Sequence, residues 1–236
     1  MKYIQVSSYD ELSEKAAEMI SAQMREKKDS VLGLATGATP VGTYEKLVKE
    51  NEQKKVDFSK AITFNLDEYV GVDGNNEQSY RYFMNKQLFS RINISLDNTF
   101  VPNGKAEDLE EECQEYEDKI TKAGGIDFQL LGIGHNGHIG FNEPGEMFIK
   151  NTHIVRLGEP TRKANARFFS SIDEVPTQAI TVGMKTITHA KKVLLLVNGK
   201  EKENIVKKAL YGPITPEIPA SILQLHPDLT VICCFD

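Results

Sequence analysis

The most informative stretch of the chain is Ile126-Asp127-Phe128-Gln129-Leu130-Leu131, continued by Gly132-Ile133-Gly134-His135-Asn136-Gly137-His138-Ile139-Gly140-Phe141-Asn142-Glu143-Pro144. Its first part has the apolar composition of a buried strand, and its second part is a polar turn rich in glycine. Open α/β sheets bind their ligands at the carboxyl ends of their strands. The turn carries two imidazoles and a carboxylate within nine residues, which indicates an enzyme.

The bulk composition is that of one globular domain. The 236 residues are 40% hydrophobic and 26% charged, so we expect a single catalytic domain over residues 1–236. The net charge of −6 argues against a nucleic acid partner. No apolar run approaches the roughly 20 residues of a membrane helix, and Met1–Gln5 lacks the apolar character of a signal peptide. The three cysteines form no disulfide framework, which favours a cytoplasmic protein without membrane contact.

Short apolar runs alternate with amphipathic segments, a pattern typical of a parallel sheet flanked by helices. The predicted strands are Val31–Thr36, Ala61–Asn65, Ile126–Gly132, Ala179–Val182, Val193–Asn198 and Thr230–Phe235. Helices are predicted by a capping box at Ser8 and Glu11, by the stripe Leu109, Cys113, Tyr116 and Ile120, and by Ile205, Val206, Ala209 and Leu210. Regular structure is weakest at about residues 145–175, which could form a lid or an ordinary surface excursion with one short helix.

A second motif, Leu34-Ala35-Thr36-Gly37-Ala38-Thr39-Pro40, also follows a predicted strand. Pro40 suits the first position of a helix, and Thr39 suits its cap. Free backbone N–H groups and the helix dipole would then face whatever precedes the helix, which favours a phosphate. The Gly-Lys-Ser/Thr ending of a nucleotide P-loop is absent. The motif predicts either a phosphate site or a plain strand-to-helix turn.

A third motif, Ile62-Thr63-Phe64-Asn65-Leu66-Asp67-Glu68-Tyr69, ends in two adjacent acids. Because neighbouring side chains point in different directions, one acid would enter a site while the other holds a loop by hydrogen bonding. A carboxylate beside an apolar strand end can act as a general base if burial raises its pKa. A turn or capping acid is the alternative.

The glycine-rich turn admits several interpretations. Gly132, Gly134 and Gly137 formally match a dinucleotide fingerprint, but the following residues do not resemble the start of a long helix. His135, His138 and Glu143 could ligate a metal, although they lack a rigid helical spacing. We favour acid–base chemistry on a sugar, in which one imidazole transfers the proton and Glu143 sets its tautomer.

Taken together, the motifs resemble the glucosamine-6-phosphate deaminase (isomerase) family. The matching segments cover nearly the whole chain in family order: residues 34–40, 64–71, 134–144, 161–169, 179–184 and 223–227. The resemblance implies a Rossmann-like, doubly wound α/β fold with a mainly parallel sheet and helices on both faces. It also implies a reaction without a metal or an organic cofactor, in which a sugar phosphate, glucosamine 6-phosphate, yields fructose 6-phosphate and ammonia.

The resemblance also assigns roles to residues. His138 would open the pyranose ring with the assistance of Glu143 and Asn136, and Asp67 would move a proton from C2 to C1. The phosphate would bind to the loop Thr36, Gly37, Ala38 and Thr39. Two cations, Arg167 and Lys202, would neutralise it, and Lys200 is the alternative to Lys202.

Two departures from the family pattern carry expectations. Many relatives have Asp where Asn136 stands, so Asn136 would orient substrate or histidine by hydrogen bonding. Hexameric allosteric members extend beyond the segment at 230–235, and their activator pocket has cations where this chain has Glu146, His153 and Val155. We therefore expect a monomer or small homo-oligomer, without activation by N-acetylglucosamine 6-phosphate.

Three rival functions remain. A 6-phosphogluconolactonase would share the fold and phosphate loop but lack the Phe-Asn-Glu-Pro continuation at 141–144. A sugar-phosphate sensor of a transcription regulator should carry a helix-turn-helix, for which the roughly 30 residues before the phosphate-loop strand leave no room. A metal-dependent hydrolase would lose its activity to a chelator.

Overall fold

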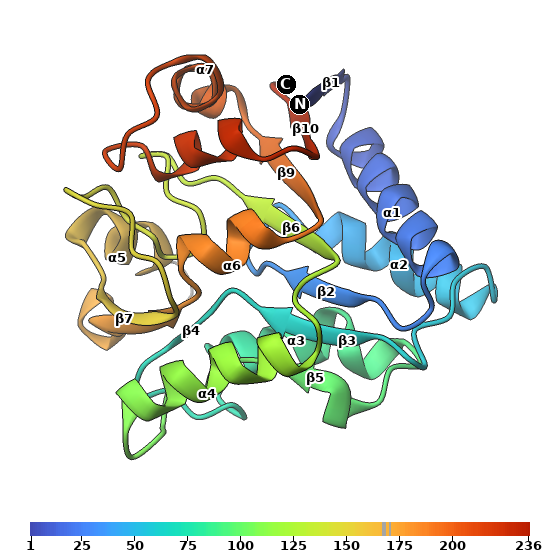
Figure 1. The fold of residues 1–236 in the computed structure, drawn as a ribbon, viewed down its shortest axis with the longest axis horizontal. Helices are drawn as coiled ribbons and strands as arrows, with labels where there is room; N and C mark the ends of the chain where they lie inside the picture. Colours follow the sequence, from blue (N-terminus) through green and yellow to red (C-terminus); the bar gives the residue numbers. More distant parts are fainter. Residues whose placement is uncertain (167–168, 170) are drawn as a thin grey trace.

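The computed structural model describes residues 1–166, 169 and 171–236, and these form a large and a small sheet (Figure 1). All neighbours in the seven-stranded sheet are parallel, in the order β1-β10-β9-β6-β2-β3-β5. The strands are β1 Lys2–Val6, β2 Val31–Leu34, β3 Ile62–Asn65, β5 Thr99–Phe100, β6 Phe128–Gly132, β9 Lys192–Asn198 and β10 Leu229–Cys234. The Rossmann-like α/β prediction is confirmed.

The direction of winding reverses between β2 and β6. After β2 the chain adds β3 and β5 on one side, and it then returns to the other side of β2 with β6, β9 and β10. A reversal of this kind opens a crevice at the carboxyl ends of the two strands, where ligands bind.

Helices cover both faces of this sheet. The helices on one face are α1 Tyr9–Glu26, α2 Val41–Glu52 and α3 Tyr80–Gln87, and those on the other are α4 Leu109–Lys122, α6 Met184–His189 and α7 Glu203–Tyr211. Side chains alternate along the strands, so Leu194 packs in the first layer and Leu195 in the second. The short 3₁₀ segments are η1 Phe89–Arg91, η2 Leu96–Asn98, η4 Ile172–Glu174, η5 Lys200–Lys202 and η6 Pro219–Leu225.

The second sheet is antiparallel and has the order β4-β8-β7. It is built from β4 Asp67–Tyr69, β7 His153–Arg156 and β8 Gln178–Thr181. The predicted strand Ala179–Val182 therefore exists, but it does not belong to the parallel sheet. Apolar periodicity identifies a strand and gives no information about its partner. Figure 1 shows this sheet at the left, beyond the arrowheads of the central strands.

The segment at residues 145–175 is more regular than predicted. It contains β7, helix α5 Glu159–Asn165 and η4. Residues 167, 168 and 170 of this segment lie outside the described residues. The predicted capping of α1 is half correct: Ser8 Oγ accepts from Glu11 N at 3.2 Å, but the Glu11 carboxylate accepts from Ser7 N.

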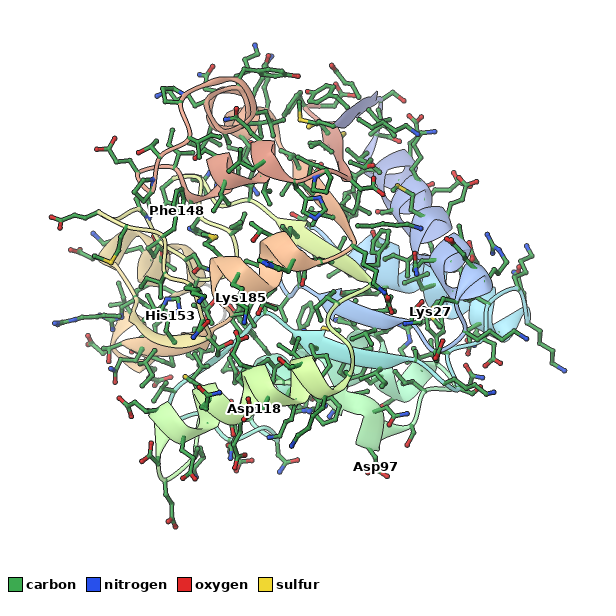
Figure 2. All side chains as sticks on the ribbon, viewed as in Figure 1. Lys27, Asp97, Asp118, Phe148, His153 and Lys185 are labelled. Atoms are coloured by element: carbon green, nitrogen blue, oxygen red, sulfur yellow. The ribbon has the colours of Figure 1, made fainter. Side chains whose placement is uncertain are left out.

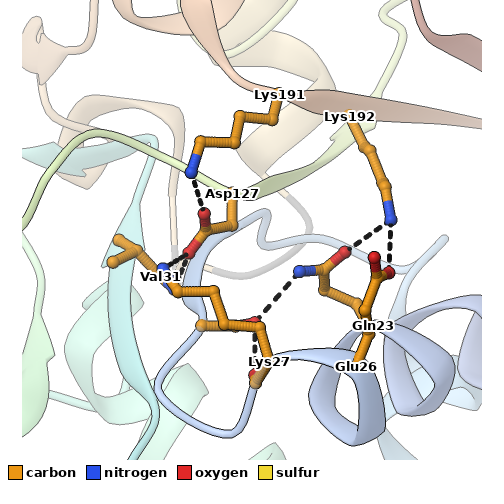
Figure 3. A network of polar contacts seen from close by, with 8 residues as sticks. Gln23, Glu26, Lys27, Val31, Asp127, Lys191 and Lys192 are labelled. Carbon is orange, nitrogen blue, oxygen red and sulfur yellow. Dashed lines mark hydrogen bonds and ion pairs between the residues drawn. The ribbon is translucent and has the colours of Figure 1, made fainter.

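An ion pair network around the buried Asp127 lies at the opposite, amino-terminal edge of the sheet (Figure 3). Asp127 precedes β6, with 2% of its side chain exposed, and accepts from Lys27 Nζ at 2.5 Å, Lys191 Nζ at 2.7 Å and Val31 N at 2.8 Å. Figure 2 shows Lys27 at the right and His153 at the left, so this network and the small sheet lie at opposite ends.

Within the described chain, no helix has the length and apolar character needed to cross a bilayer.

Candidate active site

The predicted motifs follow four strands that are neighbours in the large sheet. In the order β9-β6-β2-β3, β9 leads to η5, β6 to the histidine turn, β2 to the loop at 36–40, and β3 to Asp67. Because these strands are parallel, their carboxyl ends lie at one edge. The fold therefore gathers segments that are far apart in the sequence.

Two tyrosines form hydrogen bonds with backbone carbonyls of the loop before α2. Tyr44 donates to Ala35 O at 2.5 Å, and the Tyr9 hydroxyl hydrogen-bonds to the carbonyls of Ala38 and Thr39 at 3.0 and 3.1 Å. Gly37 has φ +95°, a conformation that favours glycine. Within the described residues, the amides of Gly37, Ala38 and Thr39 donate no hydrogen bond, so the loop can accept an anion.

The predicted cap of α2 is wrong. Pro40, not Thr39, is the N-cap, and no side chain of the cap residue bonds to the helix. Instead, the Tyr9 hydroxyl accepts the amide of Gly42 at 2.8 Å, which is the bond that a threonine cap would supply. A residue more than thirty positions away thus replaces the local cap.

Asp67 lies in β4, paired with Thr181 of β8, and only 6% of it is exposed. Gly140 of the histidine turn approaches it so closely that a Cβ there would lie 3.4 Å from Asp67 Oδ2 and 2.9 Å from Thr181 Oγ1. Burial, with the nearby charge of Glu68, raises the pKa of Asp67 to about 8. A carboxyl group in this environment has the properties of a general base with a tuned pKa.

Glu68 holds a neighbouring segment by hydrogen bonding, the role that the sequence predicted for one of the two adjacent acids. Its buried carboxylate accepts from Tyr69 N at 2.8 Å, Tyr80 N at 2.9 Å and Arg81 N at 2.9 Å. It therefore anchors the start of α3 while its neighbour faces the histidine turn. Its charge also raises the pKa of Asp67, an effect that the sequence did not predict.

Aromatic rings pack together around Tyr69, which lies in the same strand as Asp67. Tyr69 and Tyr80 lie 4.8 Å apart between ring centroids, Tyr80 stacks on Phe141 at 5.9 Å, and Phe169 meets the Tyr69 ring edge-on at 5.8 Å. The charge of Asp67 acts on the hydroxyls of Tyr69 and Tyr80, so the carboxyl group lies near this cluster.

The His138 imidazole lies over Gly134, where a Cβ would come within 2.3 Å of Nε2. Its Nδ1 is 3.4 Å from Glu143 Oε1, and 24% of the side chain is exposed. Nδ1 is otherwise without a hydrogen-bond partner in the described chain, so the contact is electrostatic and not an aligned hydrogen bond. Burial lowers the pKa of His138; Glu143 opposes this effect, and Lys202 and His135 add to it.

The Glu143 carboxylate is oriented by two further side chains. Asn136 Nδ2 donates to Oε2 at 2.7 Å, while Asn136 Oδ1 accepts from His138 N at 3.2 Å. Thr161 of α5 donates its hydroxyl to Oε1 at 2.5 Å. The sequence placed Thr161 in a basic segment and gave no signal of this contact.

The three cations that the sequence offers for the phosphate occupy different places. Lys202 lies in η5 at the carboxyl end of β9, and its charge acts on His138. The charge of Lys200 acts instead on Glu203, and the choice of Lys202 over Lys200 for the phosphate stays a prediction. Arg167 lies outside the described residues.

A cavity of about 290 Å³ lies behind the turn, lined in part by Glu143, Glu146, His153, Val155 and Arg156. The three residues predicted to replace activator-binding cations thus line one pocket. Across residues 1–166, 169 and 171–236, no three His, Cys, Asp or Glu side chains are grouped so as to hold a metal ion.

Comparisons with known proteins point to one family. The family model of glucosamine-6-phosphate isomerases/6-phosphogluconolactonase matches residues 5–232. A glucosamine-6-phosphate deaminase of Lachnoclostridium phytofermentans is 64% identical over 236 residues, all of both chains. One from Clostridium botulinum is 56% identical over 98% of this chain and 95% of its own.

Two solved structures are similar over almost the whole fold. A monomeric glucosamine-6-phosphate deaminase has a TM-score of 0.97 at 48% identity, covering 99% of this chain and 97% of its own. A 6-phosphogluconolactonase of Thermotoga maritima has a TM-score of 0.78 at 25% identity, covering all of both chains.

Proposed function

Since the chain belongs to the family of glucosamine-6-phosphate isomerases and 6-phosphogluconolactonases, we propose that it converts glucosamine 6-phosphate and water to fructose 6-phosphate and ammonia. The observation that carries this proposal is the buried Asp67, with its pKa raised to about 8, beside the turn that holds His138 and Glu143. An aldose-to-ketose shift needs one base over two adjacent carbons, and ring opening needs a separate proton shuttle. The two groups meet these two needs.

The phosphate of the substrate binds to the loop Thr36, Gly37, Ala38 and Thr39, at the start of α2. Free amides and the helix dipole favour a dianion there. Lys202, from η5 after β9, and Arg167 are the cationic partners of the phosphate. Anchoring the phosphate fixes the far end of the sugar, so that C1 and C2 reach the acid–base groups.

Ring opening is the first step. His138 takes the proton of the anomeric hydroxyl and delivers a proton to the ring oxygen, which breaks the C1–O5 bond and leaves an aldehyde at C1. Glu143 stabilises the imidazolium that forms between the two transfers, and Asn136 holds Glu143 in place.

Isomerisation and deamination follow. Asp67 takes the C2 proton while O1 takes the proton that the C2 ammonium group releases, which gives a neutral enolamine with a C1–C2 double bond. Asp67 then returns its proton to C1, leaving an iminium at C2. Water adds to C2 and ammonia leaves, so that the C2 carbonyl of fructose 6-phosphate forms.

The lactonase alternative requires different chemistry. Lactone hydrolysis needs water to attack an acyl carbon and needs no base over a neighbouring C–H bond. Burial of Asp67 and the Glu143 contact to His138 therefore favour the deaminase. The two relatives described above, at 64% and 56% identity, are both named glucosamine-6-phosphate deaminase.

The test is ammonia release from glucosamine 6-phosphate by purified, EDTA-treated protein, with fructose 6-phosphate assayed in parallel. Equal amounts of both products are expected. If neither product appears and 6-phosphogluconolactone is hydrolysed, the deaminase assignment is wrong. If EDTA treatment abolishes activity and an added metal restores it, the protein is a metal-dependent hydrolase.

We extend the proposal to the whole molecule. Residues 1–236 act as one catalytic domain in the cytoplasm, residues 145–175 close over bound substrate, and the protein is a monomer or small homo-oligomer. The solved deaminase with a TM-score of 0.97 is itself monomeric. Two acids, Glu143 and Glu146, line the 290 Å³ cavity beside the single cation Arg156, a balance that disfavours a phosphate dianion, so N-acetylglucosamine 6-phosphate does not activate the enzyme. Light scattering tests the oligomeric state, and substrate saturation curves test the absence of activation. Sigmoidal curves that N-acetylglucosamine 6-phosphate makes hyperbolic would refute the absence of activation.

A further inference from the structure

The Thr161 hydroxyl and the His138 imidazole compete for one oxygen atom. Thr161 Oγ1 is 2.5 Å from Glu143 Oε1, whereas His138 Nδ1 is 3.4 Å from the same atom. The first distance is that of a strong, charge-assisted hydrogen bond. The second belongs to a contact too poorly aligned to be one, since Nδ1 has no hydrogen-bond partner in the described part of the chain. The threonine is thus the better bonded of the two donors.

Glu143 cannot easily turn its other oxygen to the imidazole. Oε2 is occupied by Asn136 Nδ2 at 2.7 Å, and Asn136 is itself fixed by the amide of His138 at 3.2 Å. Rotation of the carboxylate would break at least one of these bonds. The position of Oε1 therefore determines how much of the negative charge reaches Nδ1.

Thr161 belongs to a helix with attachments of its own. The next residue, Arg162, donates to Ile172 O at 2.8 Å and to Val175 O at 3.1 Å, which joins α5 to the turn at η4. Leu157 N, before the helix, bonds to Thr177 O at 2.9 Å. Thr161 is buried, with 6% exposed, and it connects this unit to the histidine turn.

We propose that Thr161 is a positioning residue that sets the proton affinity of His138 by holding Oε1 of Glu143 away from full alignment with Nδ1. The inference deepens the proposed deaminase function and rests on its assignment of His138 as the proton shuttle. With the hydroxyl bond in place, the imidazole stays weakly basic. Without it, the imidazole is the remaining side-chain donor for Oε1, and the imidazolium becomes more stable.

The other groups that act on His138 do not account for this effect. Glu143 favours the imidazolium, whereas Lys202 from η5 and His135 from the same turn disfavour it. None of these three charges is altered by substitution of Thr161. A change in the titration of His138 therefore reports the geometry of Oε1.

The experiment is a pH titration of ¹⁵N-histidine-labelled, full-length protein by NMR, with the signals of His138 assigned from His138→Gln. Thr161→Val removes the hydroxyl at nearly constant volume, and Thr161→Ser is the matched control that retains it. We expect the pKa of His138 to rise by about 0.5 or more in Thr161→Val, a roughly threefold tighter proton affinity. Thr161→Ser should titrate like the wild type.

Equal titration of all three proteins would overturn the proposal, because a merely structural threonine would leave His138 unchanged. Thermal unfolding is measured for each variant, and if Thr161→Val does not fold, Thr161→Ala removes the same hydroxyl without added apolar volume. Absence of ammonia release by the wild type would refute the deaminase function only, since the NMR titration decides the role of Thr161 independently.

Discussion

Thr181 faces Asp67 across the antiparallel pair of β4 and β8, and its hydroxyl accepts from Phe141 N at 3.1 Å. One threonine therefore contacts both halves of the candidate site, the strand that carries the base and the turn that carries His138. Asn142 supports the same arrangement by donating to Val182 O at 2.9 Å. The small sheet fixes the distance between groups that the large sheet only brings to the same edge.

Asp67→Asn is expected to lower kcat for ammonia release by about 10³-fold or more, because an amide cannot take the C2 proton. Phosphate binding should persist, since the loop at 36–40 is untouched. The measurement is a steady-state assay together with the affinity for inorganic phosphate. Near-normal turnover would remove Asp67 from the role of base.

The same substitution should stabilise the fold above pH 5. Asp67 has a folded pKa of about 8, against about 3.9 in an unfolded chain, so between these values the native state holds a proton that the unfolded state has lost. The unfolding free energy of the wild type therefore falls as pH rises through this window. The Asp67→Asn variant escapes that loss, and we expect a gain on the order of 1–3 kcal/mol at pH 8 and little at pH 4. Thermal melts over this range check the sign.

Glu68→Gln should lower the pKa of Asp67, because burial of Asp67 is reinforced by the Glu68 charge. The acidic limb of kcat/KM should move to lower pH, and kcat/KM at pH 6 should increase relative to its value at pH 8. Glu117→Gln is the matched control: this buried acid accepts from Thr152 and Thr186, and its charge does not contribute to the pKa of Asp67. An unmoved limb in Glu68→Gln would contradict the electrostatic assignment.

Asn136→Ala should reduce kcat/KM about tenfold at neutral pH. The Glu143 carboxylate would lose its 2.7 Å donor, and one lost hydrogen bond to a charged group is worth about 1.5 kcal/mol or more. Melting temperatures within a few degrees of the wild type would assign the loss to orientation and not to unfolding. Unchanged kcat/KM would show that Thr161 alone suffices to hold Glu143.

Asp127→Asn should destabilise the protein by about 1–2 kcal/mol at pH 7 without changing kcat. Burial opposes the Asp127 charge, but hydrogen bonds from Lys191 and Lys27 outweigh it and hold the pKa below its usual range. This stabilisation is complete above pH about 4 and is lost as pH falls through the folded pKa. The variant should therefore show a smaller difference in stability between pH 7 and pH 2, measured by urea unfolding.

Burial explains which strands the sequence reveals. β2, β6, β9 and β10 are apolar runs, buried on both faces, and each was predicted within two residues at either end. β1 was missed because it is an edge strand in which only Val6 is buried. β4 was missed because its residues, Asp67, Glu68 and Tyr69, are those of a polar turn as well as of a strand.

Residue chemistry likewise explains which site groups the sequence reveals. Asp67, His138 and Glu143 are ionisable groups at strand ends, so their type and place indicate function. Thr161 and Tyr9 are ordinary residues whose contacts, to Glu143 across 18 positions and to Gly42 across 33, exist only after the helices dock. The roles of such residues depend on tertiary distance, which a single sequence does not contain.

The parallel pairing of β1 with β10 has a consequence for biosynthesis. Lys2 aligns with Thr230 and Val6 with Cys234, and among the described residues β10 is the one strand that pairs with β1. A ribosome therefore releases Lys2–Val6 long before β10 exists. During synthesis of the strands in between, the N–H and C=O groups with which β1 bonds to β10 have no strand partner, so β1 joins the sheet last.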